Sequence, residues 1–275
     1  MPTVEQNIKQ WNQVYEWVKQ GDEWSSSWGG AESQWFGAIF PRIHAFIPTG
    51  TILEIAPGFG RWTNYLKGYC GSLIVVDVGE NCISACRQRF ASDTHITYHV
   101  NDGRSLEMVP DHSVDFVFSF DSLVHAEADV IEAYLRQLAT KLTSNGVGFI
   151  HHSNIGDYQL DFSRMARVPK ALKPVIAKFG YDDVDHWRSF SVTARLFAKY
   201  CDQHDLQCIG QELVNWGGKR LIDCFSLFTK KTSRWATSNR VIENPEFMKE
   251  AHLIKRGSEI YATARFSDVT PGRIC

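Results

Sequence analysis

The chain has 275 residues, of which 44% are hydrophobic, and its 29 lysine and arginine residues nearly balance 31 aspartate and glutamate residues. A chain of this length buries enough surface to fold without disulfide or metal cross-links. The near-neutral charge excludes the basic excess of a general nucleic-acid binder, and no apolar run approaches the ~18 residues that a membrane span requires.

The first 49 residues form a segment rich in tryptophan. Five of the nine tryptophans lie between residues 11 and 35, and the apolar positions of residues 1–20 have helical spacing. The first six residues lack the basic and apolar regions of a secretory signal. We expect a helical arm over the sheet, in which Trp24 and Trp28 stack on an acceptor as part of a lid. The alternative is an arm that only packs against the sheet.

Residues 50–230 alternate between strand-like and helix-like segments. This alternation indicates βαβ units and a parallel sheet, and the runs 206–214 and 221–229 predict an antiparallel hairpin. The sequence therefore predicts a Rossmann-like α/β fold with a seven-stranded, mostly parallel sheet, an antiparallel C-terminal hairpin and helices on both faces. The other expected strands are 51–56, 72–78, 96–100, 114–120 and 146–153, and the expected helices are 61–69, 80–91, 127–143 and 191–204.

Two segments fall outside this alternation. Residues 154–190 are basic and contain prolines, so we expect a cap or loop insertion there. Residues 231–275 form a C-terminal tail, in which we expect a helix over 245–263. Asn244 would be the N-cap of that helix and Pro245 its first residue.

A loop with two glycines joins the first expected strand to the first helix. Gly58 and Gly60 permit a tight turn and a close approach of a ligand to the main chain. Asp77 ends the second strand, where a carboxylate is placed to accept hydrogen bonds from ribose hydroxyls. A glycine loop combined with an acidic strand end predicts a nucleoside site.

The sequence around this loop differs from the dinucleotide fingerprint, because Thr63 stands where that fingerprint has its last glycine. Glu54, on the first strand, suits a cationic amino acid better than a pyrophosphate. With Asp77 and the turn Asn101-Asp102-Gly103, the run 54–60 resembles the first motif and ribose-binding acid of class I S-adenosylmethionine-dependent methyltransferases. The resemblance covers about residues 50–230, and the family usually has glycine where this chain has Ala56.

The resemblance implies a cofactor, S-adenosylmethionine, and a position for it. Asp77 would bind the ribose, and Asp102 would face the exocyclic amine of adenine. The implied cofactor-binding residues are Glu54, Ala56, Gly58, Gly60, Arg61, Asp77, Val78, Asp102, Gly103 and Phe120.

The resemblance defines the methyl acceptor less closely than the cofactor. Residues 120–125 lack the Asn/Asp-Pro-Pro-aromatic motif of enzymes that methylate nucleobase amines, and no cysteine stands in a Pro-Cys context. The remaining targets are a hydroxyl, a small amine or a thiol. A hydroxyl needs a base aligned with its proton, and histidine suits this role.

Three histidines fall at the carboxyl ends of expected strands: His125, His151 and His152. His151 and His152 point to opposite faces of their strand, and we favour His152 slightly because it lies nearer the open end. Asp121 is an alternative base. We expect the acceptor to contact Trp24, Trp28, His151, Asn154 and Arg188.

We therefore expect an enzyme that transfers a methyl group from S-adenosylmethionine to a hydroxyl of a small molecule or glycan, with a sugar favoured. The alternatives are N-methylation of a small natural-product amine, a metal-dependent oxygen methyltransferase with Asp121 and a histidine as ligands, and a cofactor-binding module without catalysis. We expect no metal requirement, because no Asp/His cluster has clear ligand spacing. The seven cysteines form no Cys-x-x-Cys pair, which favours free thiols in the cytoplasm. The sequence leaves a homo-oligomer open.

Overall fold

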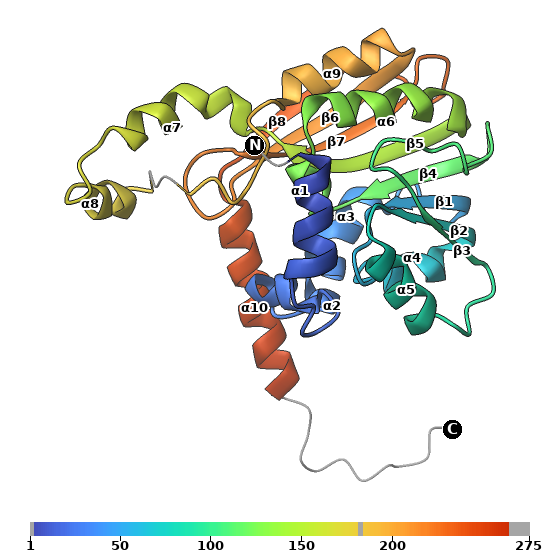
Figure 1. The fold of residues 1–275 in the computed structure, drawn as a ribbon, viewed down its shortest axis with the longest axis horizontal. Coiled ribbons are helices and arrows are strands. Elements are labelled where there is room, and N and C mark those ends of the chain that lie inside the picture. The colour runs from blue at the N-terminus through green and yellow to red at the C-terminus, as the bar shows by residue number, and fades with distance from the viewer. Residues whose placement is uncertain (1–2, 181–183, 264–275) are drawn as a thin grey trace.

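The computed structural model describes residues 3–180 and 184–263, and it contains an eight-stranded sheet between two layers of helices (Figure 1). The strand order is β3-β2-β1-β4-β5-β7-β6-β8. The strands are β1 Thr49–Ile55, β2 Cys70–Asp77, β3 Ile96–Val100, β4 Val114–Ser119, β5 Leu142–Ser153, β6 Leu206–Val214, β7 Asp223–Lys230 and β8 Arg240–Asn244. The α-helices are α1 Val4–Lys9, α2 Ala31–Gln34, α3 Phe40–Ile43, α4 Thr63–Leu66, α5 Glu80–Arg89, α6 Ala128–Lys141, α7 Gln159–Ala166, α8 Lys173–Lys178, α9 Ala194–Gln203 and α10 Phe247–Thr263.

The order of the strands creates a switch point beside β1. This strand pairs in parallel with β2 on one side and with β4 on the other. The chain therefore runs outward from β1 to β3 and then returns across β1 to continue with β4 and β5. β7 is antiparallel to both β5 and β6. In open α/β sheets, ligands bind outside the carboxyl ends of the strands at such a switch point.

Successive side chains of the central strands point into two separate hydrophobic cores. Ile52 and Phe118 belong to the core beneath α2, α3, α4, α5 and α10. Leu53 and Val117 belong to the core beneath α6 and α9, which lie together along one side of the sheet in Figure 1. The two-residue period of an extended strand produces this division.

The predicted fold is confirmed, with one strand more than expected. β8 lies in the C-terminal tail and pairs in parallel with β6 at the edge of the sheet. Its apolar residues Val241 and Ile242 are both more than half exposed, so the strand lacks the alternation that would have revealed it. The following helix, α10, begins at Phe247, two residues later than predicted, and Asn244 Oδ1 accepts a hydrogen bond from Glu246 N (3.2 Å).

The N-terminal arm contains less helix than its spacing predicted. After α1 a single π-helical turn, Gln10–Val14, ends the helix, and a 3₁₀ helix follows at Asp22–Trp28. Gly21 and Gly29 flank this second helix with φ of +90° and +89°, a conformation that favours glycine. These turns fold the arm back over the carboxyl ends of the strands.

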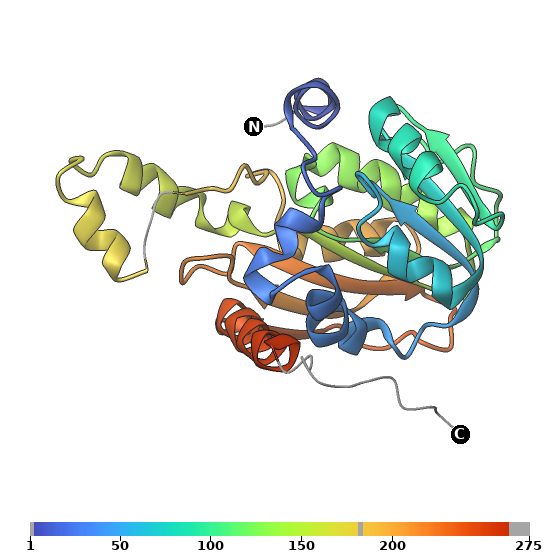
Figure 2. The same cartoon turned by 90° about the horizontal axis from the view of Figure 1, so that it is seen from below.

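The insertion after β5 forms α7 and α8, which project away from the sheet (Figure 2). Within residues 3–180 and 184–263, no helix has the length and apolar character needed to cross a membrane. The six cysteines of these two ranges are all free thiols, and Cys275 lies outside the described residues.

One core contact explains a glycine in the middle of β5. Gly148 stands opposite Phe228 in the β5–β7 pairing, and a Cβ at position 148 would overlap the Phe228 ring. We expect Gly148→Ala to lower the free energy of unfolding by ~1–3 kcal/mol, because overpacking of a dense core forces its neighbours to shift. Urea denaturation measures this change.

Gly68→Ala is the matched control, because nothing lies within 4 Å of a Cβ built there. Its effect on the free energy of unfolding should stay within about 1 kcal/mol. Equal losses for the two variants would contradict the assigned packing.

Candidate active site

A cavity of about 590 Å³ lies at the carboxyl ends of β1, β2 and β4. Residues from each strand end line it: Gly58 after β1, Asp77 at the end of β2 and Asp121 after β4. The N-terminal arm and residues 186–188 supply other parts of the wall. The cavity therefore occupies the switch point of the sheet, where the fold favours ligand binding.

The loop after β1 has the backbone conformation that its glycines suggest. Gly58 and Gly60 have φ of +58° and +84°, and Ala56 also has a positive φ of +58°. An L-residue with a side chain pays about 1–2 kcal/mol in this region, which explains why glycine suits position 56. A Cβ at Gly58 would stand 2.6 Å from the Trp17 ring, so the arm packs directly on this loop.

Asp77 ties the glycine loop to the start of α5. Its Oδ2 accepts a hydrogen bond from Gly58 N (3.1 Å), and its Oδ1 accepts one from Gly79 N (2.8 Å). Burial raises the pKa of this carboxyl to about 6, although the N–H donors favour the ionised form. Carboxylate oxygens carry further lone pairs, and Asp77 lines the cavity. This geometry suits the predicted bonds to a ribose.

Not all of the predicted cofactor residues reach the cavity. Asp102 is exposed, and its Oδ1 accepts hydrogen bonds from Arg104 N (2.8 Å) and Ser105 N (2.6 Å). Gly60 faces α5, where a Cβ would stand 2.6 Å from Phe90. Glu54, Gly60 and Asp102 are absent from the cavity wall, whereas Ala56, Gly58, Arg61, Asp77, Val78, Gly103 and Phe120 line it.

Glu54 is buried beneath the loop. Its Oε2 accepts a hydrogen bond from Thr63 Oγ1 (2.5 Å), while its Oε1 is buried without a hydrogen-bond partner. Burial raises the pKa of this carboxyl to about 8, and the negative charge of Asp77 adds to the shift. Glu54 is thus held largely in its neutral form at pH 7 in the structure.

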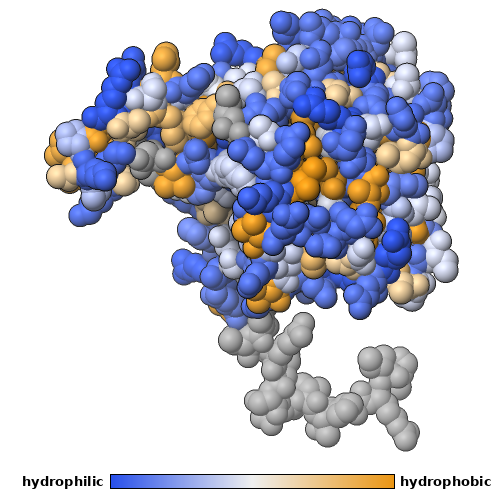
Figure 3. Space-filling view, viewed as in Figure 1, coloured by the Kyte–Doolittle hydropathy of each residue, from blue (hydrophilic) through white to orange (hydrophobic). Residues whose placement is uncertain are grey.

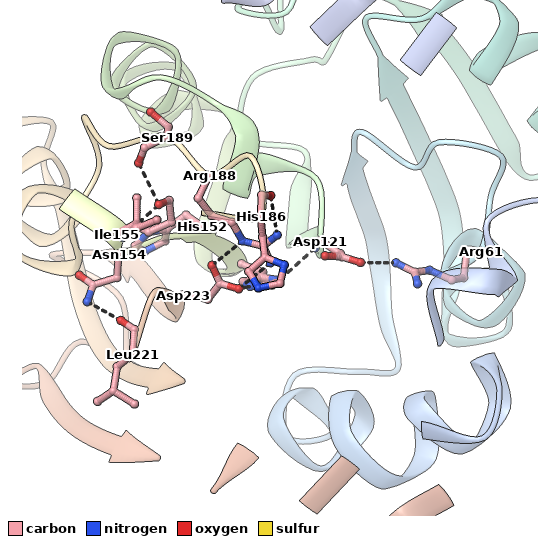
Figure 4. Close-up of polar contacts among 12 residues, drawn as sticks. Arg61, Asp121, His152, Asn154, Ile155, His186, Arg188, Ser189, Leu221 and Asp223 are labelled. Carbon is pink, nitrogen blue, oxygen red and sulfur yellow. Dashed lines mark hydrogen bonds and ion pairs between the residues drawn. The ribbon is translucent and has the colours of Figure 1, made fainter. Parts of the chain in front are cut away.

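A chain of buried charges runs along one side of the cavity (Figure 4). Arg61 Nη2 donates to Asp121 Oδ2 (3.0 Å), and the Asp121 backbone N–H donates to His151 Nδ1 (3.1 Å). His151 Nε2 lies 3.3 Å from Asp223 Oδ2. Arg188 donates to both oxygens of Asp223, at 3.0 and 2.8 Å. These contacts join the end of β4 to the ends of β5 and β7.

The Asp223 carboxyl in this series of contacts is held in its ionised form. Burial alone would raise the pKa of the Asp223 carboxyl, but Arg188 and His151 hold it well below its usual range. Asp121 has a positive φ of +65°, an unusual conformation for a residue other than glycine that occurs frequently at functional sites. The chain of charges fixes the Asp121 carboxylate at the cavity wall.

His125 is the only one of the three predicted histidines in the described cavity wall. Its Nδ1 lies 2.9 Å from the Trp187 carbonyl oxygen, and its own carbonyl accepts from Asn7 Nδ2 (3.0 Å). A carbonyl can only accept, so Nδ1 carries the proton and Nε2 keeps its lone pair. Burial lowers the pKa of His125 to about 4, and the nearby Arg188 adds to this effect.

His151 and His152 point to opposite faces of β5, as predicted from the strand period. His152 stacks on Phe197, its Nδ1 lies 2.9 Å from the Ser153 carbonyl oxygen and its Nε2 lies 2.8 Å from Ser226 Oγ. Burial lowers its pKa to about 4. Both ring nitrogens of His152 are therefore engaged away from the cavity, which favours His125 over His152 as the candidate base.

The predicted acceptor residues divide in the same way. Trp24, Trp28 and Arg188 line the cavity, whereas His151 and Asn154 do not. Asn154 is buried, where its Nδ2 donates to the Leu221 carbonyl (2.9 Å) and its Oδ1 accepts from Ala194 N (2.8 Å). This residue joins the end of β5 to the start of α9.

An aromatic cluster forms the arm side of the cavity. Trp11 is its centre, with ring centroids 5.5 Å from Tyr15, 5.2 Å from His125 and 5.7 Å from Trp187. Trp24 is the member of this cluster that the sequence predicts as an acceptor contact, and Tyr15 and Trp187 are members that it does not predict. The many aromatic residues of the N-terminal arm could have indicated that Tyr15 lines the cavity. Nothing in the sequence around residue 187 indicates that Trp187 does so.

Among the residues that the structure describes, no group of three or more His, Cys, Asp or Glu side chains is arranged to hold a metal ion. The independence of activity from a divalent metal stays a prediction.

Comparison with known proteins agrees with this geometry. Residues 52–146 match the family model described as "Methyltransferase domain". Over 119 residues the chain is 29% identical to phosphoethanolamine N-methyltransferase 1 of Triticum aestivum. That match covers 41% of this chain and only 24% of the length of the wheat protein.

Solved structures of similar fold include a protein of Pyrococcus horikoshii OT3, with a TM-score of 0.53 and 16% identity, covering 81% of this chain and 96% of that one. A SAM-dependent methyltransferase of Methanosarcina mazei has a TM-score of 0.51 and 15% identity, covering 70% of this chain and 97% of its own.

The sheet order, the glycine loop with Asp77 and the matched segment define a class I methyltransferase fold. Residues 52–146 carry a methyltransferase domain, and the resemblance to class I S-adenosylmethionine-dependent methyltransferases seen in the sequence is confirmed. The cavity fits the cofactor, because it offers an ionisable carboxylate at a strand end beside apolar walls that include Val78 and Leu123.

Asp77 provides a test of the cofactor site. We expect Asp77→Ala to weaken the binding of S-adenosylhomocysteine at least ~10-fold, because each charge-assisted hydrogen bond contributes ~1.5–3 kcal/mol. Titration calorimetry measures the dissociation constant. Asp202→Ala, at a carboxylate whose side chain is 79% exposed, is the control and should bind like the parent protein. Unchanged affinity in Asp77→Ala would refute the assignment.

Glu54 provides a second test, through the pH dependence of stability. Its pKa is about 8 in the folded protein against a usual 4.5, so the native state holds a proton that the unfolded chain releases. The contribution of Glu54 to the free energy of unfolding should therefore fall between pH 4.5 and 8, by up to ~1.4 kcal/mol per pH unit, and the difference in pH slope between the parent protein and a Glu54 variant isolates it.

Glu54→Gln should lack this contribution, because glutamine has no proton to lose, while the contributions of Asp77, His125 and His152 are present in both proteins. The exposed Glu107 supplies the control variant, Glu107→Gln. Denaturation at a series of pH values compares the three proteins, and an unaltered slope in Glu54→Gln would show that Glu54 ionises normally.

Proposed function

We propose that the whole protein transfers the methyl group of S-adenosylmethionine to a hydroxyl of a small molecule or glycan, with a sugar as the favoured acceptor. The observation that carries this proposal is the position of His125. This histidine lines the cavity with Nδ1 anchored on a carbonyl and Nε2 left as a proton acceptor. A hydroxyl acceptor needs such a group, because its pKa lies far above neutrality.

Different residues of the cavity would have different roles in the transfer. The sulfonium cofactor supplies an electrophilic methyl group when it is bound. His125 Nε2 would take the proton of the acceptor hydroxyl, and the Trp187 carbonyl would stabilise the resulting imidazolium through Nδ1. Asp121, held by Arg61 and the backbone contact with His151, would add negative charge near that cation.

The aromatic cluster would supply the acceptor surface. The rings of Trp11, Trp24 and Trp187 line the cavity, and flat aromatic faces suit the CH faces of a sugar without strict directional demands. The arm that carries the first two rings also packs on the glycine loop through Trp17, which stacks on Phe59 at 4.6 Å. We therefore propose that residues 1–49 act as a lid that orders the cofactor and acceptor together.

A second candidate is methylation of an amine. Glu23 and Glu127 also line the cavity, and among the described residues neither forms an ion pair with a cation. Carboxylates beside aromatic rings favour a cationic nitrogen. The partial likeness to a wheat protein named for phosphoethanolamine N-methylation points in the same direction. A transfer assay with labelled S-adenosylmethionine against sugars, phenols and amines, followed by product analysis, separates the two candidates.

His125→Ala tests the role of the base. With an acceptor found in that assay, we expect turnover to fall ~10²–10⁴-fold, the usual contribution of a general base, while cofactor affinity stays within about twofold. His252→Ala, at an exposed histidine of α10, is the control. Near-normal turnover in His125→Ala and in Asp121→Ala, or a methyl group on nitrogen, would overturn the hydroxyl mechanism.

The same experiment has a pH signature. Because burial lowers the pKa of His125 to about 4, the base stays neutral well below the usual histidine range. The acid limb of kcat/KM should therefore lie nearer pH 4–5 than pH 6.5.

A further inference from the structure

We propose that residues 159–180, which we call the projecting arm, dock the protein on an anionic lipid bilayer. The projecting arm contains α7, α8 and their connection, and it stands away from the sheet in two perpendicular views (Figure 1, Figure 2). The proposed docking does not depend on the methyl acceptor, since residues of the projecting arm are absent from the cavity wall.

The projecting arm exposes large apolar side chains that a free surface does not normally gather. Leu172, Val175 and Phe179 are 53%, 53% and 65% exposed. Leu172 and Phe179 are the N-cap and C-cap of α8, and the spacing of three and four residues places all three along one side of this helix and its ends. Leu160, in α7, is 71% exposed. Figure 3 shows orange, apolar side chains along this part of the molecule.

Basic side chains surround these apolar residues. The projecting arm has five basic residues and one acidic residue, a net charge of +4, in a chain whose net charge is −2. The rest of the chain therefore carries a net charge of −6, so the projecting arm is opposite in sign to the remainder of the chain. The basic residues are Arg164, Arg167, Lys170, Lys173 and Lys178, and the acidic residue is Asp161.

An anionic bilayer satisfies both properties at once. Apolar side chains of an amphipathic segment enter the boundary between headgroups and acyl chains, and lysine and arginine beside them bind anionic headgroups. A nucleic-acid backbone would leave the apolar face of α8 uncovered. A second copy paired arm to arm would bring two projecting arms of charge +4 together. A bilayer therefore fits the combination better than either alternative.

Vesicle sedimentation with the full chain tests this inference. The parent protein should sediment with phosphatidylcholine vesicles that contain phosphatidylserine and stay in solution with phosphatidylcholine alone. The bound fraction should drop steeply when salt is raised to ~0.5 M, because screening weakens the charge attraction. Val175→Ser combined with Phe179→Ser, and separately Lys170→Glu combined with Lys178→Glu, should each weaken binding at least tenfold.

Leu253→Ser combined with Ile260→Ser is the matched control, since these α10 side chains are 65% and 63% exposed. That variant should bind vesicles like the parent protein. Thermal unfolding verifies that every variant is folded, and cofactor affinity, which should not change, separates this inference from the proposed function. Failure of the parent protein to sediment with phosphatidylserine vesicles, or equal loss in the control, would overturn it. Self-association that the arm variants abolish, without vesicle binding, would assign the surface to a second copy instead.

Discussion

The parallel pairing of β1 with both β2 and β4 is the constraint on which the site depends. It brings three carboxyl ends to one point, and each end then leaves the sheet with a residue that lines the cavity. The connections differ, however, in how they are held. Asp77 fastens the first loop to the second through two backbone N–H groups, whereas Asp121, in the third loop, is held by the side chains of Arg61 and of His151 from β5.

Buried charges are tolerated beside the cavity because side chains from distant segments pair with them. Asp223 would be costly to bury alone, but Arg188 meets both of its oxygens and His151 lies against it. Arg188 lies in the segment between α8 and α9. Its ion pair with Asp223 therefore also holds the part of the cavity wall that this segment forms. The two cavity-facing arginines, Arg61 and Arg188, thus each carry a carboxylate partner. This arrangement leaves His125, the aromatic rings and the carboxylates of Glu23 and Glu127 as the groups that a ligand can meet.

The sequence predicted the fold well because periodicity reports local burial directly. The strands and helices of residues 50–230 follow from alternation, and the site at the carboxyl ends follows from topology. It predicted less about which polar residue reaches the cavity. Residue parity separated His151 from His152 but did not show that Ser226 and Phe197 engage the latter. Such partners come from β7 and α9, more than forty residues away, and their arrival depends on tertiary packing. The exposed strand β8 escaped notice because it buries almost nothing.

The crowding of indole rings in the arm has a consequence for observing the protein. The Trp11 ring centroid lies within 6.2 Å of those of both Trp17 and Trp24, and Trp17 packs on the loop that hydrogen-bonds to Asp77. Any displacement of the arm changes the solvent and ring neighbours of several indoles simultaneously. The indole rings therefore form an intrinsic optical reporter, because their ultraviolet emission would follow a movement of the N-terminal arm without an attached dye.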